Sequence, residues 1–321
     1  MMKKMLILAS LAAVMMTGAP VAEAETMREP ATFTDVAGHW AEKEIQELYI
    51  AEAISSSPAF RPDDQVTKAE LITMFVKAKK LQPSTGSSPF ADVHSDDWLA
   101  PYALTAYRLG IIDGEWVEGK LYFHPNQPVQ REEMVTMLIR AKGDSGKVNA
   151  LPWSTAIQTL QTYPDGSSIE KPYQRSFAYA LQNQVVSPYE NGQLQPEHAI
   201  TRAEAATYTA LHLLKKTDEQ RTPAGLSFNQ KLTVETTAYT HPENKAEALS
   251  YLELPLRVGI VAVDPEVIPL GSHLFIEGYG YAIAADIGSA VKAEKVDLFF
   301  ASRAEALQHG IKKGVTVYVL D

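Results

Sequence analysis

The sequence contains no cysteine and no excess of basic residues. Because disulfides cannot form, ordinary apolar cores must stabilise the fold. The formal net charge of −10 over 321 residues argues against nucleic acid as a partner, since a nucleic-acid surface requires clustered positive charge. It also argues against non-specific adhesion to an anionic wall, so any wall binding must come from local basic sites. The histidines occur singly, as at His241, His273 and His309, so we expect neither a metal site nor a cofactor.

Long apolar runs are equally scarce. After residue 19 no run approaches the ~18 continuous apolar residues of a membrane span. The single apolar run, residues 5–19, follows two lysines and precedes the small-x-small sequence Ala22-Glu23-Ala24. This arrangement predicts a secretory signal peptide at residues 1–24 and a mature chain without membrane contact. A secreted chain that lacks cysteine fits a Gram-positive cell surface better than an oxidising compartment.

Three copies of one sequence pattern occupy residues 31–82, 88–143 and 160–215. The first two copies open with Phe33-Thr34-Asp35-Val36 plus Trp40 and with Phe90-Ala91-Asp92-Val93 plus Trp98, and the weaker third opens with Tyr163-Pro164-Asp165. Apolar residues at helical spacing predict two helices in each copy. The first helices are expected at residues 41–53, 101–109 and 172–182.

A pentad of similar sequence precedes the second helix of each copy. Two pentads are predicted capping boxes, in which Thr67 and Thr201 cap a helix and a glutamate three residues later bonds back. The basic residues Lys68, Arg131 and Arg202 then lie in first helical turns, beside backbone N–H groups expected to be free. They are either three anion-binding sites or three solvated surface charges on ordinary helices, and recurrence favours the anion sites.

The sequence character changes after a polar segment at residues 216–230, which we interpret as a linker; residues 81–89 have similar composition. Beyond it, β-branched and alternating residues predict a compact β-rich domain at residues 231–321. The expected strands cover residues 232–239, 258–263, 274–276, 281–285, 296–300 and 315–320, with one helix at residues 302–309.

Three aspartates, Asp264, Asp286 and Asp297, lie in this apolar region. Alternation predicts that Asp297 shares a strand face with Phe299, and that Asp286 shares a face with the small residues Ala282 and Ala284. Asp264, which precedes a proline, could simply form a turn, and Asp286 could cap a strand end. Asp297, in mid-strand, is hardest to explain structurally. Together the carboxylates suggest a cleft for a flat, polar chain.

The three copies resemble S-layer homology (SLH) motifs in their openings with tryptophan, their Phe-x-Pro turns and their pentads. The resemblance implies a mainly α, three-motif bundle that binds pyruvylated secondary cell-wall polysaccharide at the cell surface. It assigns the contacts with the acidic ketal to the basic pentad residues, Lys68, Arg131 and Arg202, and it places Trp40 and Trp98 at the binding grooves.

The C-terminal region resembles the three-aspartate (3D) domain, which is related to the double-psi β-barrel of MltA-type lytic transglycosylases. The resemblance rests on Thr237-Ala238-Tyr239-Thr240, on Ala262-Val263-Asp264-Pro265 with Leu270-Gly271, on Ala285-Asp286-Ile287-Gly288 with Lys292, and on Val296-Asp297-Leu298. It implies a multidomain chain whose barrel cleaves peptidoglycan between N-acetylmuramic acid and N-acetylglucosamine, leaving a 1,6-anhydro end. Ile287 stands where the family usually has threonine.

The resemblance makes Asp297 the acid, with Asp264 and Asp286 positioning the sugar and stabilising oxocarbenium-like charge. Thr237, Tyr239, Thr240 and Lys292 are the expected substrate contacts. We expect burial near Phe299 and repulsion from Asp286 to raise the pKa of Asp297. Inverting hydrolysis is the competing chemistry. Two other functions stay open: a non-catalytic wall-binding protein whose barrel holds glycan or a protein partner, and a barrel acting on another β-linked polysaccharide.

Overall fold

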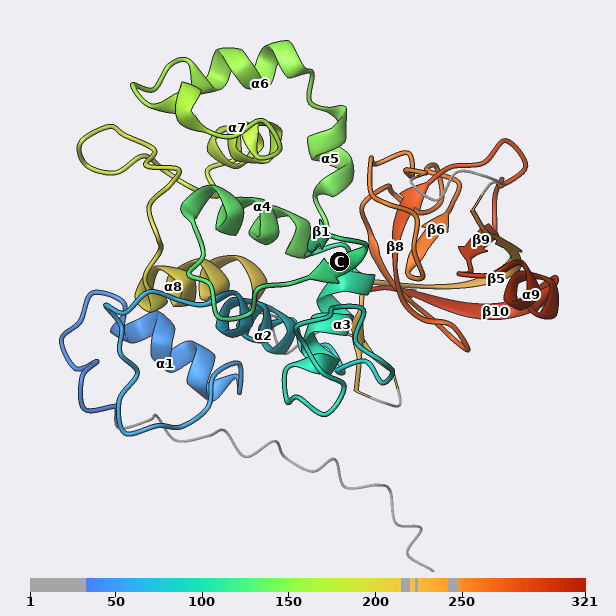
Figure 1. Cartoon of the computed structure of the whole chain (residues 1–321), viewed down its shortest axis with the longest axis horizontal. Helices are drawn as coiled ribbons and strands as arrows, with labels where there is room; N and C mark the ends of the chain where they lie inside the picture. The colour runs from blue at the N-terminus through green and yellow to red at the C-terminus, as the bar shows by residue number, and fades with distance from the viewer. Residues whose placement is uncertain (1–32, 215–219, 223–224, 242–247) are drawn as a thin grey trace, which may run out of the picture.

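The computed structural model describes residues 33–214, 220–222, 225–241 and 248–321 (Figure 1). The predicted signal peptide, residues 1–24, lies outside them. Among the described residues no helix is both long and apolar enough to cross a membrane. A helical part and a β-barrel lie side by side.

The helical part contains two helices from each repeat, as predicted. The first helices are α1 (Glu42–Ile50), α3 (Ala100–Arg108) and α7 (Gln174–Gln182), and the second are α2 (Lys68–Ala78), α4 (Arg131–Ala141) and α8 (Arg202–Leu213). A hairpin of β1 (Glu115–Val117) and β2 (Lys120–Tyr122) and two extra helices, α5 (Ser145–Ala150) and α6 (Trp153–Leu160), complete it. Both predicted capping boxes are confirmed at the starts of α2 and α8.

The three repeats meet in a closed ring of backbone hydrogen bonds. The N–H of Val66 donates to Ile200 O at 3.1 Å, the N–H of Ile200 to Val129 O at 3.0 Å, and the N–H of Val129 to Val66 O at 3.1 Å. Each pentad therefore contacts the other two, and the apolar faces of the helices share one core. The description of this part as a mainly α bundle of three equivalent motifs stays a prediction.

The C-terminal part is a closed barrel of six strands in the order β10-β5-β9-β6-β8-β7. The strands are β5 (Gln230–Tyr239), β6 (Ile260–Ala262), β7 (His273–Ile276), β8 (Gly280–Asp286), β9 (Lys295–Phe299) and β10 (Lys312–Val319), and α9 (Arg303–His309) precedes the last. All six predicted strands and the predicted helix are present. The pairs β5–β9 and β6–β8 are parallel and the others antiparallel. The double-psi topology stays a prediction.

Part of the predicted linker is folded. Strand β3 (Gln220–Arg221) pairs with β4 (Ser227–Phe228), and the ring of Phe228 packs on that of Tyr318 at 5.0 Å. Residues 81–89 are not a free linker either. The N–H of Gln82 donates to the hydroxyl of Tyr281 at 2.8 Å, and Leu81 is buried. Both segments therefore belong to a packed junction between helices and barrel.

Glycines allow the two parts to approach closely at this junction. Gly271 has φ +89°, and a Cβ built there would lie 2.5 Å from the N of Gly146 in α5. Gly259 has φ +105°, and its Cβ would lie 2.8 Å from Arg108 O at the end of α3. Since side chains at these positions would clash, glycine is required where the barrel backbone meets α3 and α5.

Buried charges reinforce the junction. The Nζ of Lys79 lies 2.7 Å from Oδ1 of Asp321, and the same carboxylate accepts the N–H of His273 at 2.7 Å. A second cluster joins Arg257 of the barrel to Asp113 at 3.6 Å, while Asp113 is bound by Arg140 at 2.6 Å. The barrel is thus fixed on the helical part through apolar, glycine and ionic contacts.

Candidate functional site

A row of paired residues crosses four strands on the outer face of the barrel, and three of the four are polar. Ala262 of β6 pairs with Asp286 on one side and with Asp297 on the other, and Asp297 pairs with Thr237 of β5. Paired residues point to the same face of a sheet. Val234, Val296 and Leu298, which alternate with this row, fill the barrel interior, as the sequence predicted for Val296 and Leu298.

Asp286 joins the row because of a bulge. Alternation places it on the face of Ala282 and Ala284, but those residues lie in the interior. The register shifts between Val261 and Ala262, so that β8 contributes one extra residue before Asp286. A bulge turns the following side chain to the other face. The prediction that Asp286 shares a face with Ala282 and Ala284 is therefore wrong, and its neighbours on the outer face include Ala262 and the hydroxyl of Tyr239.

Asp297 is half-buried, and its carboxylate accepts a hydrogen bond from Thr237 Oγ1 at 2.7 Å. Burial raises the pKa of Asp297 above its ordinary value, and the negative charge of Asp286 raises it further, while Thr237 and His309 oppose the change. This direction agrees with the sequence argument. A carboxyl group that keeps its proton to a higher pH is suited to general acid catalysis.

Asp286 is held by hydrogen bonds from three donors. Its carboxylate accepts the hydroxyl of Tyr239 at 3.2 Å and the N–H groups of Tyr251 and Ile287, each at 3.0 Å. Burial and the adjacent Asp286 carboxylate raise the pKa of Tyr239, so this hydroxyl stays protonated. The two carboxylates of the row therefore differ in their partners: Asp297 accepts one hydroxyl, whereas Asp286 accepts one hydroxyl and two backbone N–H groups.

Asp264 lies outside the row. Its two carboxylate oxygens accept the N–H of Ala293 at 2.8 Å and the N–H of Glu266 at 3.2 Å. These bonds lower the pKa of Asp264 and tie the turn after β6 to the loop that carries the exposed Lys292. The contacts support the turn-forming alternative for Asp264. Thr240 directly follows β5 and is half-buried.

Two residues near the row were not singled out from the sequence. Tyr251 supplies a backbone N–H to Asp286, and no motif marks the loop that contains it. His309, the last residue of α9, comes close to the row only because this helix packs on β5, where its Nε2 lies 3.0 Å from Thr236 Oγ1. Its charge lowers the pKa of Asp297. The described residues contain no cluster of three or more side chains able to hold a metal ion.

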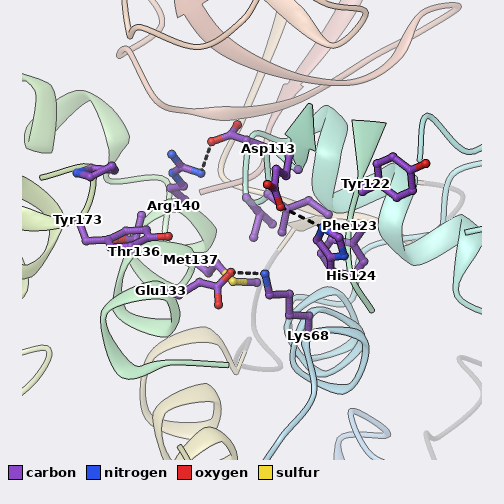
Figure 2. Close-up of a pocket in the computed structure, with 15 residues that line it drawn as sticks. Lys68, Asp113, Tyr122, Phe123, His124, Glu133, Thr136, Met137, Arg140 and Tyr173 are labelled. Carbon is purple, nitrogen blue, oxygen red and sulfur yellow. Dashed lines mark hydrogen bonds and ion pairs between the residues drawn. The ribbon is translucent and has the colours of Figure 1, made fainter. Parts of the chain in front are cut away.

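A first groove of about 360 Å³ lies between the repeats (Figure 2). Lys68 faces Glu133 across it, with Nζ and Oε1 2.8 Å apart. Arg140 faces Asp113 in the same groove, and His124 also lines it. The charged side chains are paired with one another, so an acidic ligand would have to compete with Glu133 for Lys68.

A second groove, of about 780 Å³, is lined by Trp98, Arg61, Lys77 and Arg202. The guanidinium of Arg202 forms an ion pair with Glu70 and lies over the ring of Phe60, 4.8 Å from its centroid. Trp98 is 64% exposed, and Glu70, which pairs with both Arg202 and Arg61, also lines the groove, so an acidic ligand would have to compete with Glu70 for these cations. This groove combines the side chains that an acidic sugar requires.

The remaining predicted anchor residues differ in setting. Trp40 is 62% exposed, whereas Arg131 is only 2% exposed. The guanidinium of Arg131 donates to Ser187 O at 2.7 Å and lies 4.3 Å from the ring centroid of Tyr189. The structure therefore places Arg131 in the interior rather than on a groove.

The prediction of free N–H groups in the three first turns is wrong. The N–H of Lys68 donates to Gln127 O at 3.0 Å, that of Arg131 to His198 O at 2.9 Å, and that of Arg202 to Asp64 O at 2.8 Å. Each acceptor is in the loop of another repeat. These donors hold the ring of repeats together, so anion binding must rely on side chains.

Comparison with known proteins identifies both kinds of module. The S-layer homology domain family matches residues 32–72, 89–135 and 162–206, and the 3D domain family matches residues 259–321. The chain thus contains three SLH motifs and a C-terminal 3D domain. Strand β5, which carries Thr237 and Tyr239, precedes the 3D match but pairs with β9 inside it.

The proteins similar to this chain match only part of it, and the chain spans only part of their length. The cell wall-binding protein YocH of Bacillus subtilis is 41% identical over 97 residues, which are 29% of this chain and 33% of that protein. The S-layer protein EA1 of Bacillus anthracis is 29% identical over 183 residues, 56% of this chain and 20% of that one. The structure of Escherichia coli MltA with bound chitohexaose aligns with a TM-score of 0.21 at 17% identity, over 37% of this chain and 35% of that one. The SLH motifs and the relatives YocH and EA1 indicate a secreted protein of the cell surface.

Proposed function

We propose that the protein is a peptidoglycan-cleaving enzyme, a lytic transglycosylase, held at the cell wall by its SLH motifs. The observation that carries the proposal is the outward row of the barrel, in which burial and the neighbouring Asp286 raise the pKa of Asp297, and the Asp286 carboxylate is fixed by three hydrogen bonds. A proton donor and a second carboxylate on one face of the barrel are what cleavage of a glycosidic bond requires.

In the proposed reaction the protonated Asp297 gives its proton to the glycosidic oxygen between N-acetylmuramic acid and N-acetylglucosamine. The C1–O bond breaks as the 6-hydroxyl oxygen of the muramyl residue bonds to C1, and the hydroxyl proton passes to the Asp297 carboxylate. No water is consumed, and the product is a 1,6-anhydro sugar. Asp286 lies about two strand spacings (~10 Å) from Asp297 along the row, and its carboxylate stabilises the oxocarbenium-like charge.

Anchoring follows from the two grooves. Lys68 and Arg202 line different grooves, and Trp98 accompanies Arg202. We infer that these side chains bind the acidic ketal of pyruvylated secondary cell-wall polysaccharide, while Arg131 supports the fold from inside. Since the barrel is packed against the same helices, polymer binding would hold the row against the wall.

A non-catalytic role is the second candidate, and the setting of Asp286 favours it. Ile287 is 42% exposed where a hydroxyl could contact substrate, and the Asp286 carboxylate already accepts three hydrogen bonds. In that case the row would hold glycan without cutting it.

Digestion of purified sacculi by the full chain tests the proposal. Asp297→Asn should abolish the release of muropeptides. The control variant Glu294→Gln, which removes an exposed carboxylate of the same barrel, should release them as the unmodified chain does. Equal release by both variants would exclude Asp297 as the acid. Absence of release by the unmodified chain, with binding to sacculi intact, would instead support the non-catalytic role.

A further inference from the structure

A third cavity, of about 390 Å³, lies at the junction between the helical part and the barrel. One wall comes from the helical side, with Arg140, Trp153, Lys171 and Arg175, and the other from residues 252–254 of the barrel. The segment with α5 and α6, which supplies Trp153, falls between the second and third SLH matches. The cavity adjoins the first groove, with which it shares Asp113, Arg140 and Pro172, but Trp153, Lys171 and Arg175 line the cavity and neither groove.

The cavity combines an indole with unpaired cations. Trp153 is 39% exposed, and the guanidinium of Arg175 lies 5.2 Å from its ring centroid. Arg175 is oriented by hydrogen bonds to Asn149, and its Nε is buried without a hydrogen-bond partner. In the part of the chain that the structure describes, neither Lys171 nor Arg175 has a carboxylate partner.

The acidic residues of the cavity do not cancel this charge. Asp113 is bound by both Arg140 and Arg257, at 2.6 and 3.6 Å. Glu253 is the other carboxylate of the lining, and it is exposed. A local positive excess on a chain of net charge −10 favours a ligand that carries a carboxylate.

The barrel wall of the cavity leads directly to the row of carboxylates. The N–H of Leu252 donates to Ala285 O at 2.9 Å, and the N–H of the adjacent Tyr251 donates to Asp286 at 3.0 Å. The side chain of Tyr251 is itself 51% exposed. A glycan strand that passes Asp286 can therefore extend over this loop towards Trp153.

We propose that the junction cavity is an accessory subsite for peptidoglycan, in which Trp153 packs on a sugar ring and Lys171 and Arg175 bind a carboxylate of a muramyl side chain or its peptide stem. The identity of the ligand rests on the proposed function, whereas the carboxylate chemistry comes from the cavity itself. The subsite would favour strands with free carboxylates over neutral glycan of equal length.

Binding to the full chain in the inactive Asp297→Asn background tests the subsite. The probes are a disaccharide-tetrapeptide muropeptide, a neutral N-acetylglucosamine tetramer, and a pyruvylated wall-polysaccharide fragment, titrated by calorimetry. Lys171→Glu should weaken muropeptide binding about tenfold, the value of one charge-assisted hydrogen bond, and leave the tetramer unaffected. Trp153→Ala should weaken both. Lys120→Glu, an exposed charge reversal outside the cavity, is the matched control.

Unchanged muropeptide affinity in Lys171→Glu, or an equal loss in Lys120→Glu, would overturn the subsite. So would a loss confined to the pyruvylated fragment, because the cavity would then belong to wall-polymer binding. Thermal melting of each variant checks that it is folded, which we expect since the three side chains mutated in this background, Lys120, Trp153 and Lys171, are exposed. The readout is binding, so the subsite can stand even if sacculi are not cleaved, and can fail even if they are.

Discussion

The opposing effects of Asp286 and Thr237 on Asp297 give a prediction with a defined sign. In the proposed mechanism Asp297 must be protonated to act, so activity should fall as the pH rises through its pKa. Asp286→Asn removes a like charge that raises this pKa, so the alkaline limb of the kcat/KM profile moves to lower pH. Thr237→Val removes a hydrogen bond that lowers it, so the limb moves to higher pH.

The size of the Asp286 effect follows from strand geometry. Both aspartates pair with Ala262 from neighbouring strands, which puts their Cα atoms ~10 Å apart, and we take the same distance for the two charges. With an effective dielectric constant of ~20 the repulsion is about 1.7 kcal/mol, and salt screening reduces it to about 0.5 kcal/mol at 0.15 M and about 1.2 kcal/mol at 0.01 M. The limb should therefore move by about 0.4 pH unit and about 0.9 pH unit respectively.

The assay measures initial release of dye-labelled sacculus fragments at limiting substrate over a range of pH at both salt concentrations. If turnover of a variant is too slow, NMR titration of the ¹³C-labelled Asp297 carboxyl gives the same quantity. The electrostatic reasoning would be refuted if the alkaline limbs of the two variants moved in the same direction. It would also be refuted if the shift caused by Asp286→Asn were the same at both salt concentrations. Glu294→Gln serves as the charge control.

Three further predictions concern the junction and the grooves. Gly271→Ala should lower the free energy of unfolding by about 1–3 kcal/mol more than Gly278→Ala, because both glycines have positive φ but only Gly271 meets another backbone; equal losses in chemical denaturation would remove the close-contact argument. Asp321→Asn should cost about 3–5 kcal/mol at neutral pH, since it leaves the buried Lys79 unpaired. The pairing with His273 and Lys79 depresses the pKa of Asp321, so its stabilisation is present above the unfolded-state value and disappears as the pH falls through the folded-state value; an acid-unfolding curve of the variant as steep as that of the unmodified chain would contradict this. Lys68→Ala and Arg202→Ala should weaken retention on pyruvylated wall with little change in Tm, whereas Arg131→Ala should mainly lower Tm; full retention by the first two would exclude side-chain anion binding at the grooves.

Local sequence signals predicted the secondary structure well because they depend on neighbouring residues. The threonine–glutamate pairs that cap α2 and α8 lie three residues apart, and alternation along β9 correctly separated Asp297 from Val296. The same rule failed at Asp286, because a bulge depends on how β8 pairs with β6, a partner about 20 positions away.

Long-range contacts account for the other differences. The N–H groups of the three first turns bond to loops of other repeats, which no single helix sequence reveals. The same is true of the burial of Arg131 beneath Tyr189. The sequence did not predict the junction. Residues 81–89 have the composition of a linker, and the contacts of Leu81 and Gln82 form only once both parts are folded.

The most direct test of the central claim is digestion of sacculi by the full chain in ¹⁸O-labelled water, followed by mass spectrometry of the released ends. Ring closure by the muramyl 6-hydroxyl predicts anhydro ends that carry no label and that disappear with Asp297→Asn. Reducing ends that each carry one ¹⁸O atom would show that water is the nucleophile, and would contradict the proposed transglycosylase.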